Sequence, residues 1–398
     1  GQGLGFKTYW ESHGLAPAAS GPQLDAYARS LALFGLPITA ARTETNSSGD
    51  TVVTQWFERA RFEWHPDKLA EFKVLLGRFG DELLPTLGGG ERPTGRIVYV
   101  SARDTSTGGD LYSMNADGTG QIRLTSTGAI PLETAEYAVS PAGDRIAYRS
   151  GGSLNVIRTD GTDQQVVATA EVGETAPFEV FAPTWAPDGS YLAYVSRGDI
   201  YASRLDGSPP ARITQDAGIS SPACLSWARN GYLTFRTAAM HTFKLFVVRS
   251  DGSDLRQVAF GLCGTLSPAG DRMIFTNGAD LWLVNLDGSN AHPLTGSGNF
   301  LPASWSPDGT RVLSVAYDSA NPDARDIFVV DPTARATWQI TSGAIAGIRP
   351  SWSPDGKHIA FASRRTGRSG IYVMRADGTD QRLLPTLEES GSPQWLPR

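Results

Sequence analysis

The sequence predicts an all-β protein, a seven-bladed β-propeller with four-stranded blades, preceded by a small α+β module at the N-terminus. The first observation behind this prediction is a repeat: one series of short strands and turns recurs seven times between Arg96 and the C-terminus. The second is the length of the repeat, since units of about 40 to 47 residues with four short strands are typical of propellers. The third is an extra strand at the end of the chain, which can complete the first unit.

Most of the repeats have two tight turns that separate their strands. The first turn, Ser-Pro-Asp-Gly or a variant, occurs at residues 140–143, 186–189, 228–231, 267–270, 306–309 and 353–356. Proline presets the first φ of such a turn, and glycine accepts the positive φ that follows. Strands are then expected at residues 145–148, 191–195, 232–235, 272–275, 311–315 and 358–361. The second turn begins at Asp117, Asp160, Asp206, Asp251, Asp287 and Asp377, each followed by glycine, which is a strong hairpin signal.

The two ends of the repeat array predict how the ring closes. The first copy, which starts at residues 96–100, has no preceding Trp strand, and the chain ends on a spare one at residues 392–395. If this terminal strand completes the first blade, the ring leaves no sheet edge open. We therefore expect seven closed blades over residues 96–398, with a horseshoe or solenoid as the alternative.

The repeat resembles a known family. Trp352–Gly356 reads Trp-Ser-Pro-Asp-Gly, Ile371–Met374 reads Ile-Tyr-Val-Met, and Asp377–Thr379 reads Asp-Gly-Thr. These segments resemble the WD40-like, PD40-type repeats of the TolB propeller family, which also occur in the propeller domains of prolyl-oligopeptidase relatives. The resemblance implies a fold and does not by itself imply one function, because propellers support binding, scaffolding and several chemistries.

Residues 1–88 differ in character from the repeats and are expected to form a separate α+β module. Residues 6–13 and 25–33 have the periodicity of short amphipathic helices, and residues 51–63 that of paired strands. Gly88 opens a glycine-rich stretch that predicts a linker over residues 89–95.

Part of this module resembles the LGFP repeat of bacterial cell-surface proteins. The similarity rests on Phe34–Pro37 and Gln55–Glu58, and the module departs from it at Ala60, where the family usually carries glycine. The resemblance implies attachment to the cell envelope. Its aromatic side chains suit either a carbohydrate platform or a small core, and the core is favoured in a unit of this size; they are Trp56, Phe57, Phe62 and Trp64.

Composition narrows the classes of partner. The net charge is −6 and no lysine cluster is present, which argues against nucleic-acid binding. No apolar run reaches the 18 or so residues of a membrane span. The chain begins with Gly1 rather than Met, so we expect a mature form or a fragment, and we infer export to an extracellular, cell-surface or periplasmic location.

The two cysteines occupy equivalent positions in neighbouring repeats. Cys224 stands three residues before Trp227, and Cys263 three residues before Leu266. A disulfide between two blades would indicate an oxidising compartment. Two buried reduced thiols that pack as small apolar groups are the alternative.

Catalytic and metal-binding motifs are sparse. The five histidines have no metal-ligand spacing, and the sequence contains neither His-Glu-x-x-His nor a Gly-x-Ser-x-Gly nucleophile elbow. One acidic hairpin, with Asp318, Asn321, Asp323 and Asp326, offers enough oxygen atoms for Ca²⁺, although such loops often bond only to their own backbone. We expect no other cofactor. If the chain is an enzyme acting at the channel mouth, Glu136 and His241 are the first candidates.

The tight turns share one end of the propeller, so sequence variation gathers at the other end, where binding residues are expected. The densest charge group there is Arg364, Arg365 and Arg368, with Arg349 nearby. Arginine side chains can bind a carboxylate or an anionic polymer in a forked geometry, although solvated surface arginines are the ordinary case.

Three functions remain open. The first is a non-catalytic exported or cell-surface binding or scaffold protein, whose variable loops hold a protein or a glycan. The second is a propeller hydrolase or lyase with its site at the channel mouth. The third is a periplasmic TolB-like component of an envelope-tethering complex.

Overall fold

The computed structural model describes residues 42–45, 51–56, 61–64, 74–76 and 93–397, except 105–107, 133–135, 170–182, 216–218, 220–221, 240–241, 297, 302–303, 319–320, 343–348 and 387–388. The chain divides into two compact units, Gly1–Arg92 and Pro93–Arg398. Each unit is considered by itself below.

The first unit contains one antiparallel sheet in the order β1-β2-β3-β4. Its strands are β1 (Arg42–Thr45), β2 (Thr51–Trp56), β3 (Arg61–Trp64) and β4 (Val74–Leu76). β2 pairs with β3, as the alternation over residues 51–63 predicts. Phe62 is fully buried, which fits its interpretation as a core residue. The helices expected over residues 6–13 and 25–33 lie outside the described residues.

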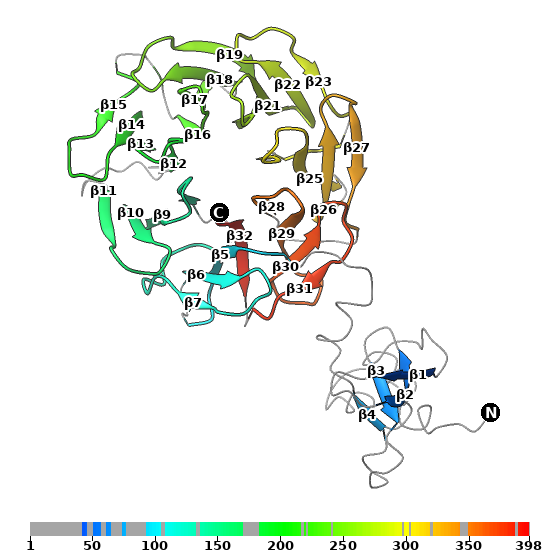
Figure 1. The fold of residues 1–398 in the computed structure, drawn as a ribbon. Helices are drawn as coiled ribbons and strands as arrows, with labels where there is room; N and C mark the ends of the chain where they lie inside the picture. Colours follow the sequence, from blue (N-terminus) through cyan, green and yellow to red (C-terminus); the bar gives the residue numbers. More distant parts are fainter. Residues whose placement is uncertain are drawn as a thin grey trace. The chain divides into compact units, whose positions relative to one another are not determined.

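The second unit is a ring of seven four-stranded antiparallel blades, which confirms the predicted fold (Figure 1). From the inner to the outer strand, the first four blades are β32 (Ser390–Trp395), β5 (Arg96–Ser101), β6 (Asp110–Asn115), β7 (Ile122–Arg123); β8 (Tyr137–Val139), β9 (Arg145–Ser150), β10 (Ser153–Arg158), β11 (Gln165–Thr169); β12 (Thr184–Trp185), β13 (Leu192–Ser196), β14 (Asp199–Ser203), β15 (Ala211–Arg212); and β16 (Ala223–Trp227), β17 (Tyr232–Ala239), β18 (Thr242–Arg249), β19 (Arg256–Phe260).

The remaining three blades follow the same order. They are β20 (Gly264–Leu266), β21 (Arg272–Asn277), β22 (Asp280–Asn285), β23 (His292–Pro293); β24 (Ser304–Trp305), β25 (Val312–Asp318), β26 (Asn321–Asp331), β27 (Ala336–Gln339); and β28 (Ser351–Trp352), β29 (His358–Ser363), β30 (Gly370–Arg375), β31 (Arg382–Leu383). We call the end of the propeller with the first and third hairpins of each blade the turn end, and the opposite end the loop end.

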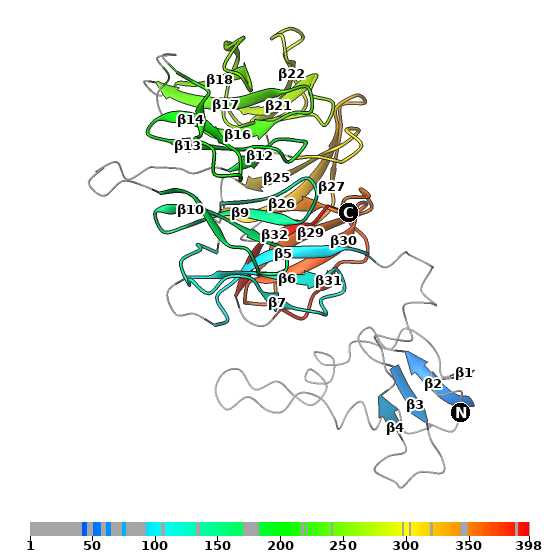
Figure 2. The same ribbon diagram turned by 60° about the vertical axis from the view of Figure 1, so that its left-hand side comes forward.

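The C-terminal strand closes the ring, as predicted. β32 pairs antiparallel with β5, with Ser390 opposite Ser101 and Trp395 opposite Ile97. Figures 1 and 2 show β32 beside β5 at the inner edge of the first blade. The two ends of the repeat array therefore share one sheet, and no inner strand of the first blade is missing.

The repeated turns have the backbone geometry that their residues predict. Gly356, in the first turn of the last repeat, has a φ of 69°, a conformation that glycine adopts without a steric penalty. In the second turn, Asp377 Oδ1 accepts hydrogen bonds from the Thr379 N–H at 2.9 Å and the Thr379 hydroxyl at 2.6 Å. These bonds hold the hairpin in place, and they lower the pKa of Asp377.

The core lies between adjacent blades. In one cluster, Trp352, Phe361 and Tyr372 of the last blade pack against Leu313 and Ile327 of the blade before it. Each blade thus buries its faces only by stacking on its neighbours, which explains why the repeats form a closed ring. No helix in the described part of the chain is long and apolar enough to cross a membrane.

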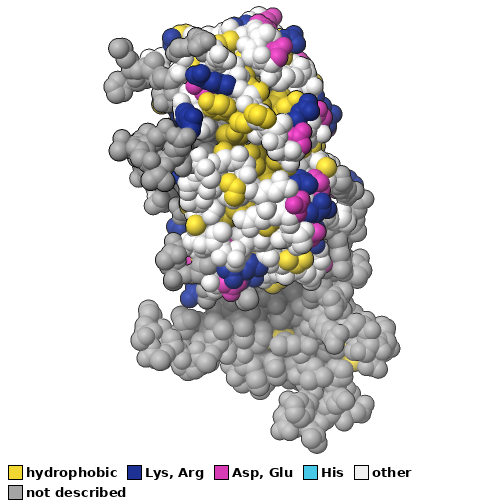
Figure 3. All heavy atoms as spheres, turned by 90° about the vertical axis from the view of Figure 1, so that its left-hand side faces the viewer, with side chains coloured by type: hydrophobic (Ala, Val, Ile, Leu, Met, Phe, Trp, Pro, Cys, Tyr) yellow, Lys and Arg dark blue, Asp and Glu magenta, His cyan; other side chains and the backbone are white. Residues whose placement is uncertain are grey.

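The outer wall of the propeller carries paired charges. On the face shown in Figure 3, acidic and basic side chains lie next to one another. Ion pairs of this kind include Arg145 with Asp163 at 3.2 Å and Arg158 with Asp160 at 3.7 Å. The charges of these side chains largely offset one another.

Candidate binding site in the central cavity

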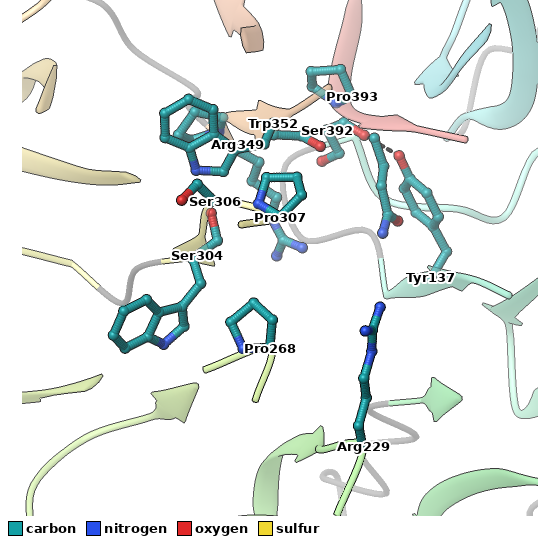
Figure 4. A pocket seen from close by; sticks show the side chains of 14 residues that line it. Tyr137, Arg229, Pro268, Ser304, Ser306, Pro307, Arg349, Trp352, Ser392 and Pro393 are labelled. Atoms are coloured by element: carbon teal, nitrogen blue, oxygen red, sulfur yellow. Dashed lines mark hydrogen bonds between the residues drawn. The ribbon is translucent and has the colours of Figure 1, made fainter. Parts of the chain in front are cut away.

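A cavity of about 510 Å³ lies inside the ring of inner strands (Figure 4). Its wall is formed by inner strands and first turns from six of the seven blades, and it includes Tyr137, Arg229, Pro268, Trp305, Arg349 and Trp352. This volume falls within the range of small-molecule and peptide-anchor pockets. The wall combines aromatic and proline surfaces with two cationic side chains.

Arg229 reaches the cavity from the turn end. It occupies the second position of the first turn in the fourth blade, where the other six blades carry Pro141, Pro187, Pro268, Pro307, Pro354 and Pro397. The turn keeps its shape without proline, because Gly231 has a φ of 84° and the Asn230 amide donates to the Gly270 carbonyl at 2.6 Å. Arg229 therefore replaces the usual proline side chain, while the backbone of the turn keeps its conformation.

Arg349 reaches the same cavity from the loop end, since it lies just before β28. It stands three residues before Trp352, in the same register as Glu136, Cys224, Cys263 and Ser392 of other blades. Figure 4 shows the side chains of Arg229 and Arg349 extending into the open space between the inner strands. Two guanidinium groups from opposite ends thus face one cavity.

Glu136 is a half-buried carboxyl group whose charge interacts with that of Arg349. Burial raises its pKa, and the charges of Arg149 and Arg349 oppose that rise. Arg149 Nη1 lies 3.8 Å from Glu136 Oε2, an oxygen that has no hydrogen-bond partner among the described residues. Glu136 therefore offsets part of the positive charge at the loop end and is itself easier to protonate than an exposed glutamate.

Tyr137 fixes one wall of the cavity. Its hydroxyl donates to the carbonyl oxygen of Ser392 and lies 3.1 Å from the carbonyl oxygen of Val98. Burial raises the pKa of Tyr137, so the hydroxyl stays protonated as a donor. The second blade is thereby tied to the strand that closes the ring.

The two cysteines are paired across neighbouring blades. Their Cα atoms lie 5.3 Å apart, within the range that a disulfide requires, and the structure joins their sulfur atoms. Cys224 sits at an irregularity in β16 with a φ of 56°. Ser392, in the same register, has a φ of 51° at a similar irregularity in β32. This bend recurs in two of the seven inner strands.

Within the predicted arginine group, Arg365 makes contacts inside its own blade. Arg365 lies over the ring of Tyr372 at 4.8 Å and donates to Gln381 Oε1 at 2.7 Å. Arg103 does the same in the first blade, over Tyr112 at 4.3 Å and with Gln121 at 2.6 Å. Arg365 is thus part of a repeated structural contact within its own blade, in contrast to Arg349 in the cavity wall.

The other two arginines of that group, Arg364 and Arg368, are exposed on the β29–β30 hairpin. His241, the second catalytic candidate, lies outside the described residues. A role for these residues in binding or catalysis stays a prediction.

The calcium hypothesis also stays a prediction. The side chains of Asp318 and Asp323 lie outside the described residues, and Asn321 is exposed. Asp326 accepts hydrogen bonds from Thr341 and Gln339, each at 3.1 Å. Over the residues that the structure describes, no group of three or more His, Cys, Asp and Glu could hold a metal ion.

Asp326 belongs to a repeated bridge that sequence reasoning missed. At the equivalent position Asp110 accepts from Thr125 at 2.7 Å, and Asp199 accepts from Thr214 at 2.8 Å. In each of these three blades the sequence has an aspartate followed 15 residues later by a threonine, and this spacing could have indicated the bridge. The bridge ties the third strand of a blade to the segment after its fourth strand.

Arg229 was the other residue that sequence reasoning missed. Its signal was the replacement of proline by arginine in one of six equivalent turns. A side chain at this position points toward the axis only once the ring is closed, so its importance depends on the tertiary structure.

Comparison with known proteins supports the repeat assignment. Residues 279–398 match the family described as the TolB beta propeller domain, PD40. An uncharacterized protein of Agrobacterium fabrum is 26% identical over 220 residues, which cover 54% of this chain and 60% of that protein. A protein named TolB homolog from Chlorobaculum tepidum is 30% identical over 145 residues, or 33% of this chain and 32% of its own length.

These matches confirm the resemblance of the repeats to TolB propellers. The chain spans 60% of the Agrobacterium relative and about a third of the TolB homolog, so what those whole proteins do is not carried over directly. The resemblance of the N-terminal module to LGFP repeats stays a prediction.

Solved structures agree on the fold. An oligogalacturonate lyase from Vibrio parahaemolyticus has a TM-score of 0.53 at 15% identity, covering 73% of this chain and 86% of its own. A prolyl endopeptidase structure has a TM-score of 0.55 at 16% identity, covering 75% of this chain and 50% of its own. At these identities the similarity shows the propeller fold alone.

Proposed function

We propose that this chain is a TolB-like propeller of the bacterial cell envelope that binds a protein partner through its central cavity and the loops around it, without chemical change to that partner. The observation that carries the proposal is the cavity itself. It joins aromatic and proline surfaces to Arg229 and Arg349, the combination of apolar area and a few placed charges that is typical of binding sites.

The envelope location rests on two lines of support. The repeats of this chain resemble those of TolB, an exported protein. The pairing of Cys224 with Cys263 suits an oxidising compartment. For the N-terminal module we propose attachment to the envelope, on the basis of its resemblance to LGFP repeats.

A capture experiment tests the binding function. The purified full chain, immobilised, is incubated with solubilised envelope proteins and separately with cell-wall glycan. We expect a specific protein to be retained and then released by competition with soluble full chain. Retention of glycan alone, or of nothing that the soluble chain displaces, contradicts the proposal.

The N-terminal module is tested by sedimentation with purified cell wall. We expect the full chain to sediment with the wall and a chain starting at Pro93, the boundary between the two compact units, to stay in solution. Equal sedimentation of both contradicts the attachment role while leaving the binding role of the propeller untouched.

A second candidate function is enzymatic, and Glu136 is the observation that favours it. A carboxyl group with a raised pKa, an unbonded oxygen and an arginine nearby resembles a general acid or base. Turnover of envelope glycans or acidic polysaccharides, followed by mass spectrometry, would reveal such an activity. Arg158→Gln, which changes an arginine that does not line the cavity, is the control. An activity abolished by Glu136→Gln but retained in this control would favour the enzyme over the binding protein.

A further inference from the structure

We propose that Arg229 and Arg349 form a two-point anchor for a carboxylate group of the ligand. The inference rests on the proposed function, because it specifies the chemistry of the ligand that the central cavity receives. The repeat does not account for either arginine, because the equivalent positions of the other blades carry different residues.

The first step is that Arg229 is available for a ligand. It is exposed, and within the described part of the chain its guanidinium has no hydrogen bond or ion pair. Its backbone turn is held by neighbouring groups, including the bond from Asn230 to the Gly270 carbonyl. The charge of Arg229 therefore has no evident role in folding, and its side chain extends into the cavity (Figure 4).

The second step is that the cavity carries an excess of positive charge. Among the described lining residues are two arginines and no aspartate, glutamate or histidine. Glu136, next to Tyr137 in the chain, interacts with both Arg349 and Arg149, so its single negative charge offsets only part of the charge of Arg349. Two positive charges in a partly enclosed site repel each other. An anion that binds between the two arginines relieves this repulsion and is itself attracted to both groups.

The third step identifies the anion as a carboxylate on a larger group. A guanidinium presents a planar fork of N–H donors that matches the two oxygens of a carboxylate. The rest of the wall is largely apolar, with Pro268 and Pro307 and a small part of Trp305 and Trp352, which are each only 8% exposed. The indole N–H of Trp305 already donates to the Thr265 carbonyl at 3.1 Å, so it is not available to a ligand. A strongly hydrated inorganic anion would leave these surfaces without a contact.

A peptide is the favoured carrier of this carboxylate, because the proposed partner is a protein. A free organic acid carries the same carboxylate group. The two sources share the chemistry of the anchor, and the test separates them by using one probe of each kind.

The test measures binding to the full chain by isothermal titration calorimetry with three probes: glutarate, an acetylated and amidated tetraglutamate peptide, and the matching tetraglutamine peptide. The variants are Arg229→Pro, which installs the residue that six other blades carry, and Arg349→Gln. Arg158→Gln, at a half-exposed arginine in the third strand of the second blade, is the matched control. Melting curves establish that all four proteins are folded.

We expect the tetraglutamate peptide to bind, and each cavity variant to weaken it about 10- to 100-fold, the range for one charged hydrogen-bonding partner. Arg158→Gln should bind like the wild type, and the tetraglutamine peptide should not bind. Glutarate bound as tightly as the acidic peptide would support the anchor with a free acid as its source. Equal binding of the two peptides, unchanged affinity in Arg229→Pro, or no binding of either acidic probe would overturn the anchor.

The same variants separate this inference from the proposed function. If the wild type and both cavity variants retain an envelope protein equally, the binding function holds and the carboxylate anchor is wrong. If the acidic probes bind as expected but no protein is retained, the anchor holds and the protein-binding function is wrong.

Discussion

The hydroxyl of Tyr137, on the innermost strand of the second blade, donates a hydrogen bond to the carbonyl oxygen of Ser392, 255 residues later in the chain. The acceptor lies on β32, the strand that closes the ring by pairing with β5. One side chain therefore joins the second blade to the first at the point where the two ends of the repeat array meet.

Removing this hydroxyl should loosen the closure. Tyr137→Phe is expected to lower the free energy of unfolding by about 1 to 2 kcal/mol, because the bond is lost and a part-buried carbonyl is left without its donor. Chemical denaturation measures the change. Tyr201→Phe is the control, since the Tyr201 hydroxyl has no hydrogen-bond partner in the described structure. Equal effects of the two substitutions would show that Tyr137 has no special part in closure.

The link between Cys224 and Cys263 should stabilise two neighbouring blades. With a sequence separation of 39 residues, the chain-entropy account predicts a loss of about 4 kcal/mol when the bond is removed. The double substitution to serine should lower the melting temperature, and a reducing agent should lower that of the wild type but not that of the double variant. Mass mapping under non-reducing conditions would detect the bonded peptide pair directly. A free thiol at both positions in protein isolated from its native source would contradict the pairing.

Asp110 should stabilise the first blade in a pH-dependent way. Burial raises its pKa, but hydrogen bonds from Thr125, Arg123 and the backbone of Gly128 and Thr127 outweigh burial and leave the pKa lowered. A lowered pKa in the folded state contributes stability above the unfolded value, and this contribution is lost as the pH falls through the folded value.

Asp110→Asn should therefore destabilise the protein by about 3 kcal/mol at neutral pH, since it disrupts a fully buried bonded charge. The difference from the wild type should shrink as the pH falls below about 4, the ordinary pKa of an aspartate in the unfolded chain, and on through the lower pKa of the folded state. Denaturation at a series of pH values measures it. A difference that is constant across the series would show that the ionised carboxylate is not the stabilising form.

Glu136 should act in the opposite direction. Burial raises its pKa despite Arg149 and Arg349, so the folded state binds the proton more tightly than the unfolded state. The stability associated with that proton is present below the unfolded pKa and is lost as the pH rises through the folded pKa. The melting temperature of Glu136→Gln relative to the wild type should therefore be higher at pH 7 than at pH 4. A relative melting temperature that falls over this interval would mean that the ion pair with Arg149 dominates.

Arg365 should affect stability rather than ligand binding. Arg365→Ala removes its contact with Tyr372 and its bond to Gln381, and we expect a loss of about 1 to 2 kcal/mol. Arg368→Ala, on the same hairpin, should change stability by less than about 0.5 kcal/mol, as is usual for exposed surface positions. If both substitutions leave stability unchanged and both weaken partner capture, the arginine group would be a binding surface after all.

Much of the fold could be predicted from local signals in the sequence. The Pro-Asp-Gly and Asp-Gly turns position each hairpin through the conformations of single residues, and the spare strand ending at Trp395 predicts the closure that the pairing with Ile97 confirms. The helical part of the N-terminal module lies outside the described residues, so that expectation has no structural counterpart.

The candidate site was harder to predict, because its residues come from different blades. Arg349 was selected as one of four arginines near one another in the sequence, yet Arg365 is bound within its own blade while Arg349 lines the cavity. Arg229 could not be predicted as a site residue, because a single changed turn residue carries no indication of what its side chain faces.

The sequence by itself determined the number of blades, the positions of their turns and the strand that closes the ring, because each depends on interactions between residues close in the repeat or on the periodicity of the whole. Only the tertiary structure decided which side chains meet. Arg229 and Arg349 share a cavity, and Tyr137 meets Ser392, because a closed ring of seven blades brings together on its axis residues that lie far apart along the chain. No local pattern encodes that convergence.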